Sequence, residues 1–146
     1  MKTQEYLDLI DKQRKDIEDF PIAYAFNDEQ LKEALKKLGV ESTDECVTIF
    51  GSGDIVKKEN ALPFIEMLKC HTRIVQNKLK EDADFAEAAF LYEMDNHEYA
   101  INMDGDDDVL RCFGMDYEDL RGWGLQLAYE SARRKHFEHM EEWGVL

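Results

Sequence analysis

The thirty residues from Glu81 to Leu110 combine a dense acidic charge with a run of apolar side chains. They contain eleven aspartates and glutamates and no lysine or arginine, in a chain whose net charge is -15. Apolar residues from Phe85 to Met94 cover nearly every side of a predicted helix, so we expect this helix to be central in the fold. A concentrated negative field repels nucleic acid and anionic membranes, and it attracts basic protein surfaces or metal ions. We therefore expect neither direct nucleic-acid binding nor membrane binding.

Length and composition favour one folded domain over residues 1–146. The chain is 44% hydrophobic and includes sixteen aromatic residues, which is enough apolar matter for a core. The three cysteines, Cys46, Cys70 and Cys112, have no C-x-x-C spacing, so free thiols in a reducing compartment are expected. No apolar stretch approaches the roughly 18 residues that span a bilayer, and the amino terminus is amphipathic. We expect a cytoplasmic protein.

Helical periodicity accounts for most of the chain. Apolar residues spaced three and four apart predict helices over residues 3–20 and 61–79, the second after an N-cap at Asn60. A capping box at Asn27 and Gln30 predicts another helix between these two, and Gly39 is in a suitable C′ position to end it.

A small antiparallel sheet is also predicted. Two segments rich in β-branched residues, Cys46–Phe50 and Asp54–Lys57, flank the turn Gly51-Ser52-Gly53 and favour a β-hairpin. The segment Ile22–Phe26 is a candidate third strand, because two strands alone are marginal. The fold class that follows is α+β, mainly helical, with a small antiparallel β-sheet or hairpin.

The chain after residue 98 is predicted in shorter pieces. Tyr99–Ile101 is expected as a short strand, Asn102–Asp108 as a loop, and Val109–Phe113 as one or two helical turns. Asp116 is expected to open the last element. Its regular helix is delayed to about Leu125, since two glycines precede that position and each costs about 1 kcal/mol in a helix interior.

The acidic residues could imitate nucleic acid. Duplex DNA carries one charge per about 1.7 Å of axis, and carboxylates three or four residues apart on a helix lie about 5–6 Å apart. We predict that such a face occupies the basic groove of a nucleic-acid-binding protein and inhibits it as a DNA mimic. The alternative is a solvated surface that maintains solubility. The predicted partner-binding residues are Glu81, Asp82, Asp84, Asp95, Glu98, Asp104, Asp106, Asp107 and Asp108.

Metal binding is another use of the same region. A calcium loop centred on Gly105 fails, because Ala100 and Arg111 would stand at two ligand positions. A looser site formed by Asp95, His97 and Glu98 is the basis of an alternative hypothesis, a metal-dependent enzyme. The chain has no nucleophile motif and no phosphate-binding loop. We therefore expect no catalytic residue, no cofactor and no bound metal.

The histidines and the basic segments allow further alternatives. We predict that His136 and His139 lie on the surface of the last helix and that His71 is structural. The basic residues of Lys69–Lys80 and Arg133-Arg134-Lys135 could pair with acidic groups of the same chain or join two copies in a homodimer. An accessory assembly protein, whose acidity only keeps it soluble, is the third class of function that the sequence leaves open.

Three segments carry a resemblance to known proteins. They are Pro21 to Gln30, the Gly51-Ser52-Gly53 turn, and Tyr92-Glu93-Met94-Asp95-Asn96-His97-Glu98-Tyr99. Together they resemble a family of small uncharacterised acidic proteins from bacterial phages and mobile elements, over roughly residues 20 to 115. The resemblance implies a class of function, the inhibition of host defence, which includes anti-CRISPR proteins that imitate DNA. It assigns no role to any residue.

Overall fold

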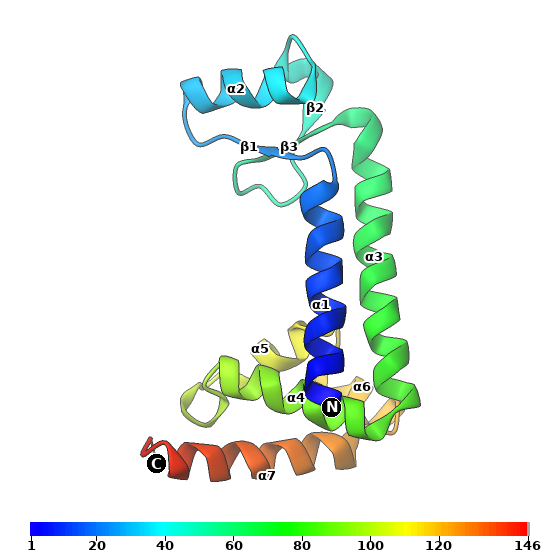
Figure 1. Cartoon of the computed structure of the whole chain (residues 1–146), viewed down its shortest axis with the longest axis vertical. Coiled ribbons are helices and arrows are strands. Elements are labelled where there is room, and N and C mark those ends of the chain that lie inside the picture. Colours follow the sequence, from blue (N-terminus) through cyan, green and yellow to red (C-terminus); the bar gives the residue numbers. More distant parts are fainter. Residues whose placement is uncertain (146) are drawn as a thin grey trace. The chain divides into compact units, whose positions relative to one another are not determined.

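The computed structural model describes residues 1–145, which form two compact units (Figure 1). Unit 1 comprises Met1–Asp11 together with the chain from Thr72 onward, and unit 2 comprises Lys12–His71. Each unit has its own clusters of buried apolar residues. Two long helices contribute residues to both units, and the expectation of a single domain stays a prediction.

Helices make up most of the described chain, as the sequence predicts. The α-helices are α1 (Lys2–Asp19), α2 (Asp28–Leu38), α3 (Lys58–Glu81), α4 (Ala83–Asn96), α5 (Gly105–Arg111), α6 (Tyr117–Gly122) and α7 (Gln126–Glu142). Two 3-10 turns are η1 (Thr43–Glu45) and η2 (Tyr99–Ile101).

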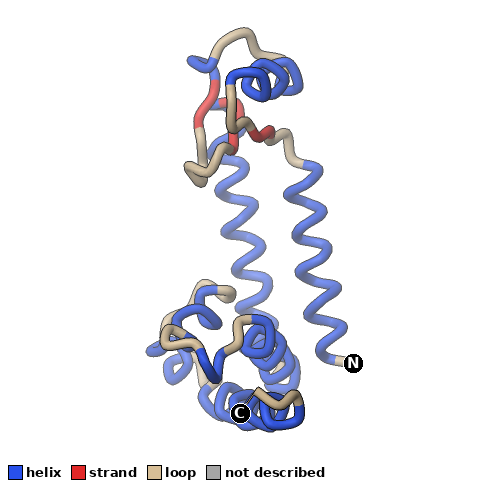
Figure 2. Tube along the Cα trace, turned by 90° about the vertical axis from the view of Figure 1, so that its left-hand side faces the viewer, coloured by secondary structure: helices blue, strands red, loops and turns tan. Residues whose placement is uncertain are grey.

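Unit 2 contains a small antiparallel sheet, which confirms the predicted α+β class (Figure 2). Its strands are β1 (Ala23–Tyr24), β2 (Cys46–Val47) and β3 (Asp54–Lys57). The order is β1-β3-β2, with Ala23 opposite Ile55 and Val47 opposite Val56. The predicted hairpin and third strand are therefore both present, although the strand predicted over residues 46–50 ends at Val47.

One buried carboxylate explains why that strand is short. Asp54 is 1% exposed, and its oxygens accept hydrogen bonds from the amides of Phe50, Ile49 and Ser52 and from the Thr48 hydroxyl, at 2.6–3.2 Å. These amides bond to a side chain instead of continuing the ladder. Burial alone would raise the pKa of Asp54, but the four donors outweigh it and lower the pKa to about 2.

The ends of α2 follow the sequence prediction, except that the Gln30 side chain bonds to the Phe26 amide and not to the Asn27 amide that a capping box requires. The Asn27 side chain accepts a hydrogen bond from the Gln30 amide at 2.8 Å, and Gln30 Oε1 accepts from the Phe26 amide at 2.8 Å. Gly39 ends the helix with a φ of 72°, a conformation that suits glycine. The start of α3 differs from the prediction, because β3 leads directly into the helix at Lys58 and Asn60 lies in its first turn.

Helix α4 is the centre of unit 1, as predicted from its apolar residues. Its buried side chains include Phe85 and Phe90, both with no exposed surface, and it packs along α7 (Figure 1). The Phe90 ring meets Phe113 and Tyr129 edge to face, with both centroids 5.2 Å away. Such aromatic pairs stabilise a core beyond the area they bury.

The structure corrects the prediction for residues 99–108. Tyr99–Ile101 form the turn η2 and no strand, and the predicted loop already contains the start of α5 at Gly105. The Tyr99 hydroxyl donates to Asp106 at 2.6 Å, and a Cβ at Gly105 would lie 2.9 Å from the Tyr99 ring. This close packing between η2 and α5 overrides the β-propensity of the segment.

The last part of the chain agrees with the predicted glycine interruption. Asp116 and Asp119 form a capping box that starts α6, and Gly124 has a φ of 69° between α6 and α7. Helix α7 then begins at Gln126, one residue after the predicted position. Within residues 1–145, no helix has both the length and the apolar character needed to cross a membrane.

Candidate functional site

Unit 1 carries most of the negative charge. It contains 21 acidic residues against nine lysines and arginines, whereas unit 2 contains twelve against nine. Some of the charge is neutralised within unit 1: Lys135 pairs with Glu87, and Lys78 lies 4.0 Å from Glu5. The negative charge that the predicted binding role requires is therefore concentrated in unit 1.

Four of the nine predicted partner-binding residues, Asp82, Asp95, Asp106 and Asp108, accept hydrogen bonds inside unit 1. Asp82 caps α4 by accepting from the Phe85 amide at 3.0 Å. It also accepts from Lys2 at 2.6 Å, and this bond, more than the cap, lowers the pKa of Asp82. Asp108 accepts from the Asn102 amide group at 2.7 Å. These contacts tie the acidic segment to its own fold.

Asp106 is held between two tyrosines. Tyr99 and Tyr129 donate their hydroxyls to the same oxygen of Asp106, at 2.6 and 2.5 Å. Burial, and then the bond to Asp106, raises the pKa of Tyr99 to about 12 and raises that of Tyr129 as well. Both hydroxyls therefore keep their protons and remain donors, so Asp106 has a structural role here.

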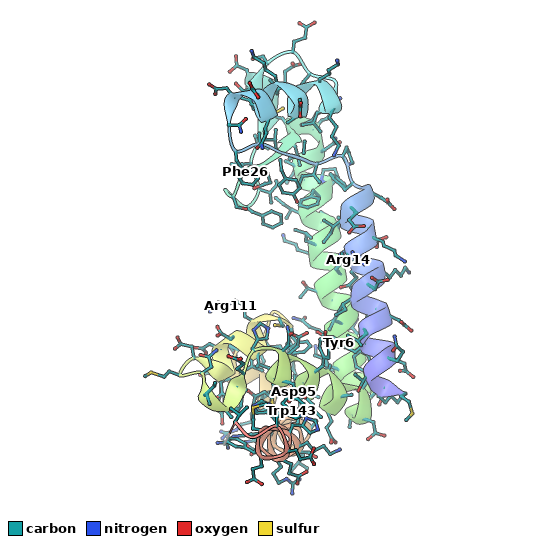
Figure 3. The ribbon with its side chains drawn as sticks, turned by 60° about the vertical axis from the view of Figure 1, so that its left-hand side comes forward. Tyr6, Arg14, Phe26, Asp95, Arg111 and Trp143 are labelled. Carbon is teal, nitrogen blue, oxygen red and sulfur yellow. The ribbon has the colours of Figure 1, made fainter. Side chains whose placement is uncertain are left out.

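Asp95 accepts from two histidines of α7. His136 Nδ1 lies 2.7 Å from one Asp95 oxygen and His139 Nδ1 lies 2.8 Å from the other. His136 has no exposed surface, and its Nε2 accepts from the Ala100 amide at 3.0 Å, which places the ring proton on Nδ1. His139 stacks on Trp143 near the end of α7, in the region where Figure 3 labels Asp95 and Trp143. The prediction that His136 lies on the surface is therefore wrong.

Five of the predicted residues face solvent. In the described part of the chain their carboxylates have no ion-pair partner. They are Glu81, Asp84, Glu98, Asp104 and Asp107. The predicted site is thus divided into an engaged group and an exposed group, and its binding role stays a prediction.

An open groove of ≈ 620 Å³ lies in unit 1 between the first half of α1, the last third of α3 and the start of α4. Leu9 and Ile74 contribute apolar surface to it, and Ile74 is 45% exposed, whereas Phe85 lies buried beneath the lining. Its polar lining consists of Glu5, Asp8, Asn77, Lys78 and Glu81. Three carboxylates against one ammonium give the groove an acidic rim, which includes one predicted site residue.

A second arrangement joins Glu93, His97 and Cys112. Glu93 Oε2 lies 3.3 Å from His97 Nε2 and 3.4 Å from Cys112 Sγ, and the sulfur lies 3.3 Å from the same histidine nitrogen. The Tyr6 hydroxyl, from α1, donates to the other oxygen of Glu93 at 2.9 Å. Glu93 is 7% exposed, so these contacts replace its hydration.

This trio does not have the geometry of a thiol nucleophile relay. In a Cys-His-acid relay, the acid binds the ring nitrogen that faces away from the thiol. Here Glu93 faces the same nitrogen as Cys112 and also contacts the sulfur itself. Burial, and then the charge of Glu93, raises the pKa of Cys112 to about 12, which opposes thiolate formation.

The structure does not bring Asp95, His97 and Glu98 together. Asp95 contacts α7, His97 contacts Glu93 and Cys112, and Glu98 is exposed with a φ of 53°. The sequence offers one signal that was missed: Glu93 and His97 are four residues apart, which places them on one helix face. Nothing in the spacing points to Cys112.

No curated protein and no solved structure matches the chain. A family model does match, over residues 5–135, and its description is a family of unknown function, DUF7659. This span includes the residues that line the groove and Tyr6, Glu93, His97 and Cys112.

Proposed function

The chain belongs to the DUF7659 family of unknown function, and we propose that it is a non-enzymatic protein that binds a basic surface of a partner protein. One observation supports this most: an open groove in the acidic unit combines apolar side chains with three carboxylates. The partner element that fits is an amphipathic helix with lysines or arginines beside its apolar face.

The apolar part of the groove would supply affinity. Ile74, in the last third of α3, presents 45% of its surface to solvent, and the partly exposed Leu9 lines the groove beside it. Burying apolar area contributes about 25 cal/mol per Å² removed from water, so aliphatic anchors of a partner would bind here. An acidic surface that only maintains solubility does not require an apolar groove.

The charges would supply steering and specificity. Glu81 has no ion-pair partner within the described residues, and Asp8 is exposed. Beyond the rim, the excess of acid across unit 1 attracts a basic partner over longer distances and speeds its association. Both effects are screened by salt, with a Debye length of about 10 Å at 0.1 M.

The partner class that this chemistry favours is a nucleic-acid-binding protein. Such proteins carry basic surfaces that bind phosphates, and an acidic protein on that surface would exclude nucleic acid as a DNA mimic. In its most specific form, which rests on the sequence resemblance alone, the partner is a CRISPR effector and the chain is a phage or mobile-element inhibitor.

The first test uses a synthetic helical peptide of lysine and leucine with one apolar face, labelled for fluorescence anisotropy. We expect binding to the full chain that weakens steeply between 50 and 200 mM salt, the range over which screening of exposed charges increases. Glu81→Lys should weaken binding about tenfold at low salt, which corresponds to about 1.4 kcal/mol. The matched control is Glu33→Lys, an exposed helical glutamate of unit 2.

The two variants change the net charge equally, so their comparison separates the groove from the overall charge. Equal weakening by both would contradict binding in the groove. Binding that is insensitive to salt would contradict the electrostatic part of the proposal. Duplex DNA should bind to neither variant of the chain. It should, however, compete with the chain for a basic nucleic-acid-binding protein.

A further inference from the structure

We propose that Glu93, His97 and Cys112 form a binding site for a single Zn²⁺ ion, independent of the groove. The three residues offer one oxygen, one nitrogen and one sulfur, and these atoms lie within 4.8 Å of one another. All three belong to unit 1: Glu93 is on α4, His97 ends it, and Cys112 ends α5. The proposal opposes the expectation from sequence that no metal is bound.

The separations match tetrahedral zinc coordination. Bonds of about 2.3 Å to sulfur and about 2.0–2.1 Å to nitrogen and oxygen place tetrahedral ligands about 3.6 Å apart for S–N and S–O, and about 3.4 Å apart for N–O. The corresponding distances here are 3.3, 3.4 and 3.3 Å. An ion therefore fits after outward shifts of about 0.3 Å or less.

The donor set selects the metal. Metal binding releases the proton of a cysteine ligand, and the resulting thiolate, with an imidazole, suits zinc and related transition ions, whereas magnesium and calcium prefer oxygen ligands alone. The site is also open to an entering ion, and one of its ligands is held by a hydrogen bond. Cys112 is exposed and His97 is partly exposed, so an ion can enter, while the Tyr6 hydroxyl holds the far oxygen of Glu93.

The site has three protein ligands. Structural zinc sites have four, whereas sites that bind a water or a substrate have three. The fourth tetrahedral position would therefore face solvent and hold a water molecule. The chemical class of ligand that could replace this water is a small anion or a neutral oxygen or nitrogen donor.

The test is metal titration of the full chain. We expect calorimetry with Zn²⁺ to give one ion per chain, and Co²⁺ to give the thiolate-to-metal absorption band and the visible spectrum of tetrahedral cobalt. Cys112→Ser should abolish the thiolate band and weaken Zn²⁺ binding at least about tenfold, the lower end of the effect of losing even an outer-shell partner. Cys70→Ser is the control, because Cys70 is an exposed thiol outside the trio.

Two results would overturn the proposal. One is the absence of saturable Zn²⁺ binding by the folded chain, and the other is equal Zn²⁺ affinity and an equal cobalt band for Cys112→Ser and Cys70→Ser. His97→Gln gives a second readout: it should shift the cobalt spectrum and retain the thiolate band. Cys112 is exposed and His97 is partly exposed, so far-ultraviolet circular dichroism should show native helicity in both variants.

Discussion

Removal of the Tyr6 hydroxyl should destabilise unit 1 by about 1.5–3 kcal/mol, the usual contribution of a hydrogen bond to a charged group. Tyr6 is 3% exposed, and its hydroxyl donates to Glu93 at 2.9 Å. Tyr6→Phe keeps the ring and its edge contact with Phe85, whose centroid is 6.0 Å away. The variant therefore removes one donor without opening a large cavity.

The size of the effect follows from the burial of the acceptor. Glu93 is 7% exposed, so water cannot easily replace the lost donor. Burial, and then Glu93, raises the pKa of Tyr6, so the hydroxyl stays protonated and continues to donate at neutral pH. A buried acceptor that loses its partner costs the full desolvation of that group.

The assay is urea denaturation followed by tryptophan fluorescence, because both tryptophans, Trp123 and Trp143, lie in unit 1. The control is Tyr117→Phe, since Tyr117 is 57% exposed, and its free energy of unfolding should stay within about 0.5 kcal/mol of the parent. A loss for Tyr6→Phe no larger than that of the control would refute the reasoning. Additive losses of unfolding free energy for Tyr6→Phe and Glu93→Met in the double variant would also refute it, because a direct bond requires a coupling energy of about 0.5–3 kcal/mol.

Three further predictions concern stability. Asp54→Asn should cost roughly 2 kcal/mol at pH 7, since the pKa of Asp54 is lowered from 3.8 to about 2. This contribution is complete well above pH 3.8 and is lost as the pH falls toward 2. Urea denaturation should therefore show that the difference in unfolding free energy between Asp54→Asn and the parent shrinks below about pH 4. Equal differences at pH 7 and pH 2.5 would contradict this account. His136→Phe should cost roughly 2–4 kcal/mol by chemical denaturation, because the Ala100 amide and Asp95 both lose a buried partner; a loss under about 1 kcal/mol would be unexpected. Asp82→Ala should lower the urea midpoint of unfolding through the lost cap of α4, and Asp82→Asn should recover most of this loss, whereas equal losses would show that the cap contributes little.

The sequence predicted those parts of the fold that local chemistry decides. Asn27 and Gly39 begin and end α2 through contacts with their own neighbours, and the hairpin follows from two β-branched segments around a glycine turn. The apolar surround of α4 also identified the centre of unit 1. These features require no knowledge of distant contacts.

The errors have a common physical cause, which is contact between different helices and turns of the fold. His136 reads as a surface residue on an amphipathic helix, but its partners are Asp95 and Ala100, 41 and 36 residues away. Tyr99 reads as part of a strand, yet its hydroxyl bonds to Asp106 and its ring packs on Gly105.

The candidate site shows the same limit. Composition identified the acidic region, but only the structure separates the exposed carboxylates from those held by lysine, tyrosine and histidine. Cys112 joins Glu93 from 19 residues away, and Tyr6 joins it from 87. These contacts depend on how α1, α4 and α5 pack in unit 1. The spacing of residues along the sequence does not predict this packing.

The most direct test of the proposed function is a backbone amide NMR map of the 17.1 kDa chain, recorded with and without the lysine–leucine peptide. The account predicts that the largest shift changes fall on the groove residues, including Leu9, Ile74 and Glu81, and that they diminish at high salt. Shift changes centred on unit 2, or spread evenly over both units, would contradict it.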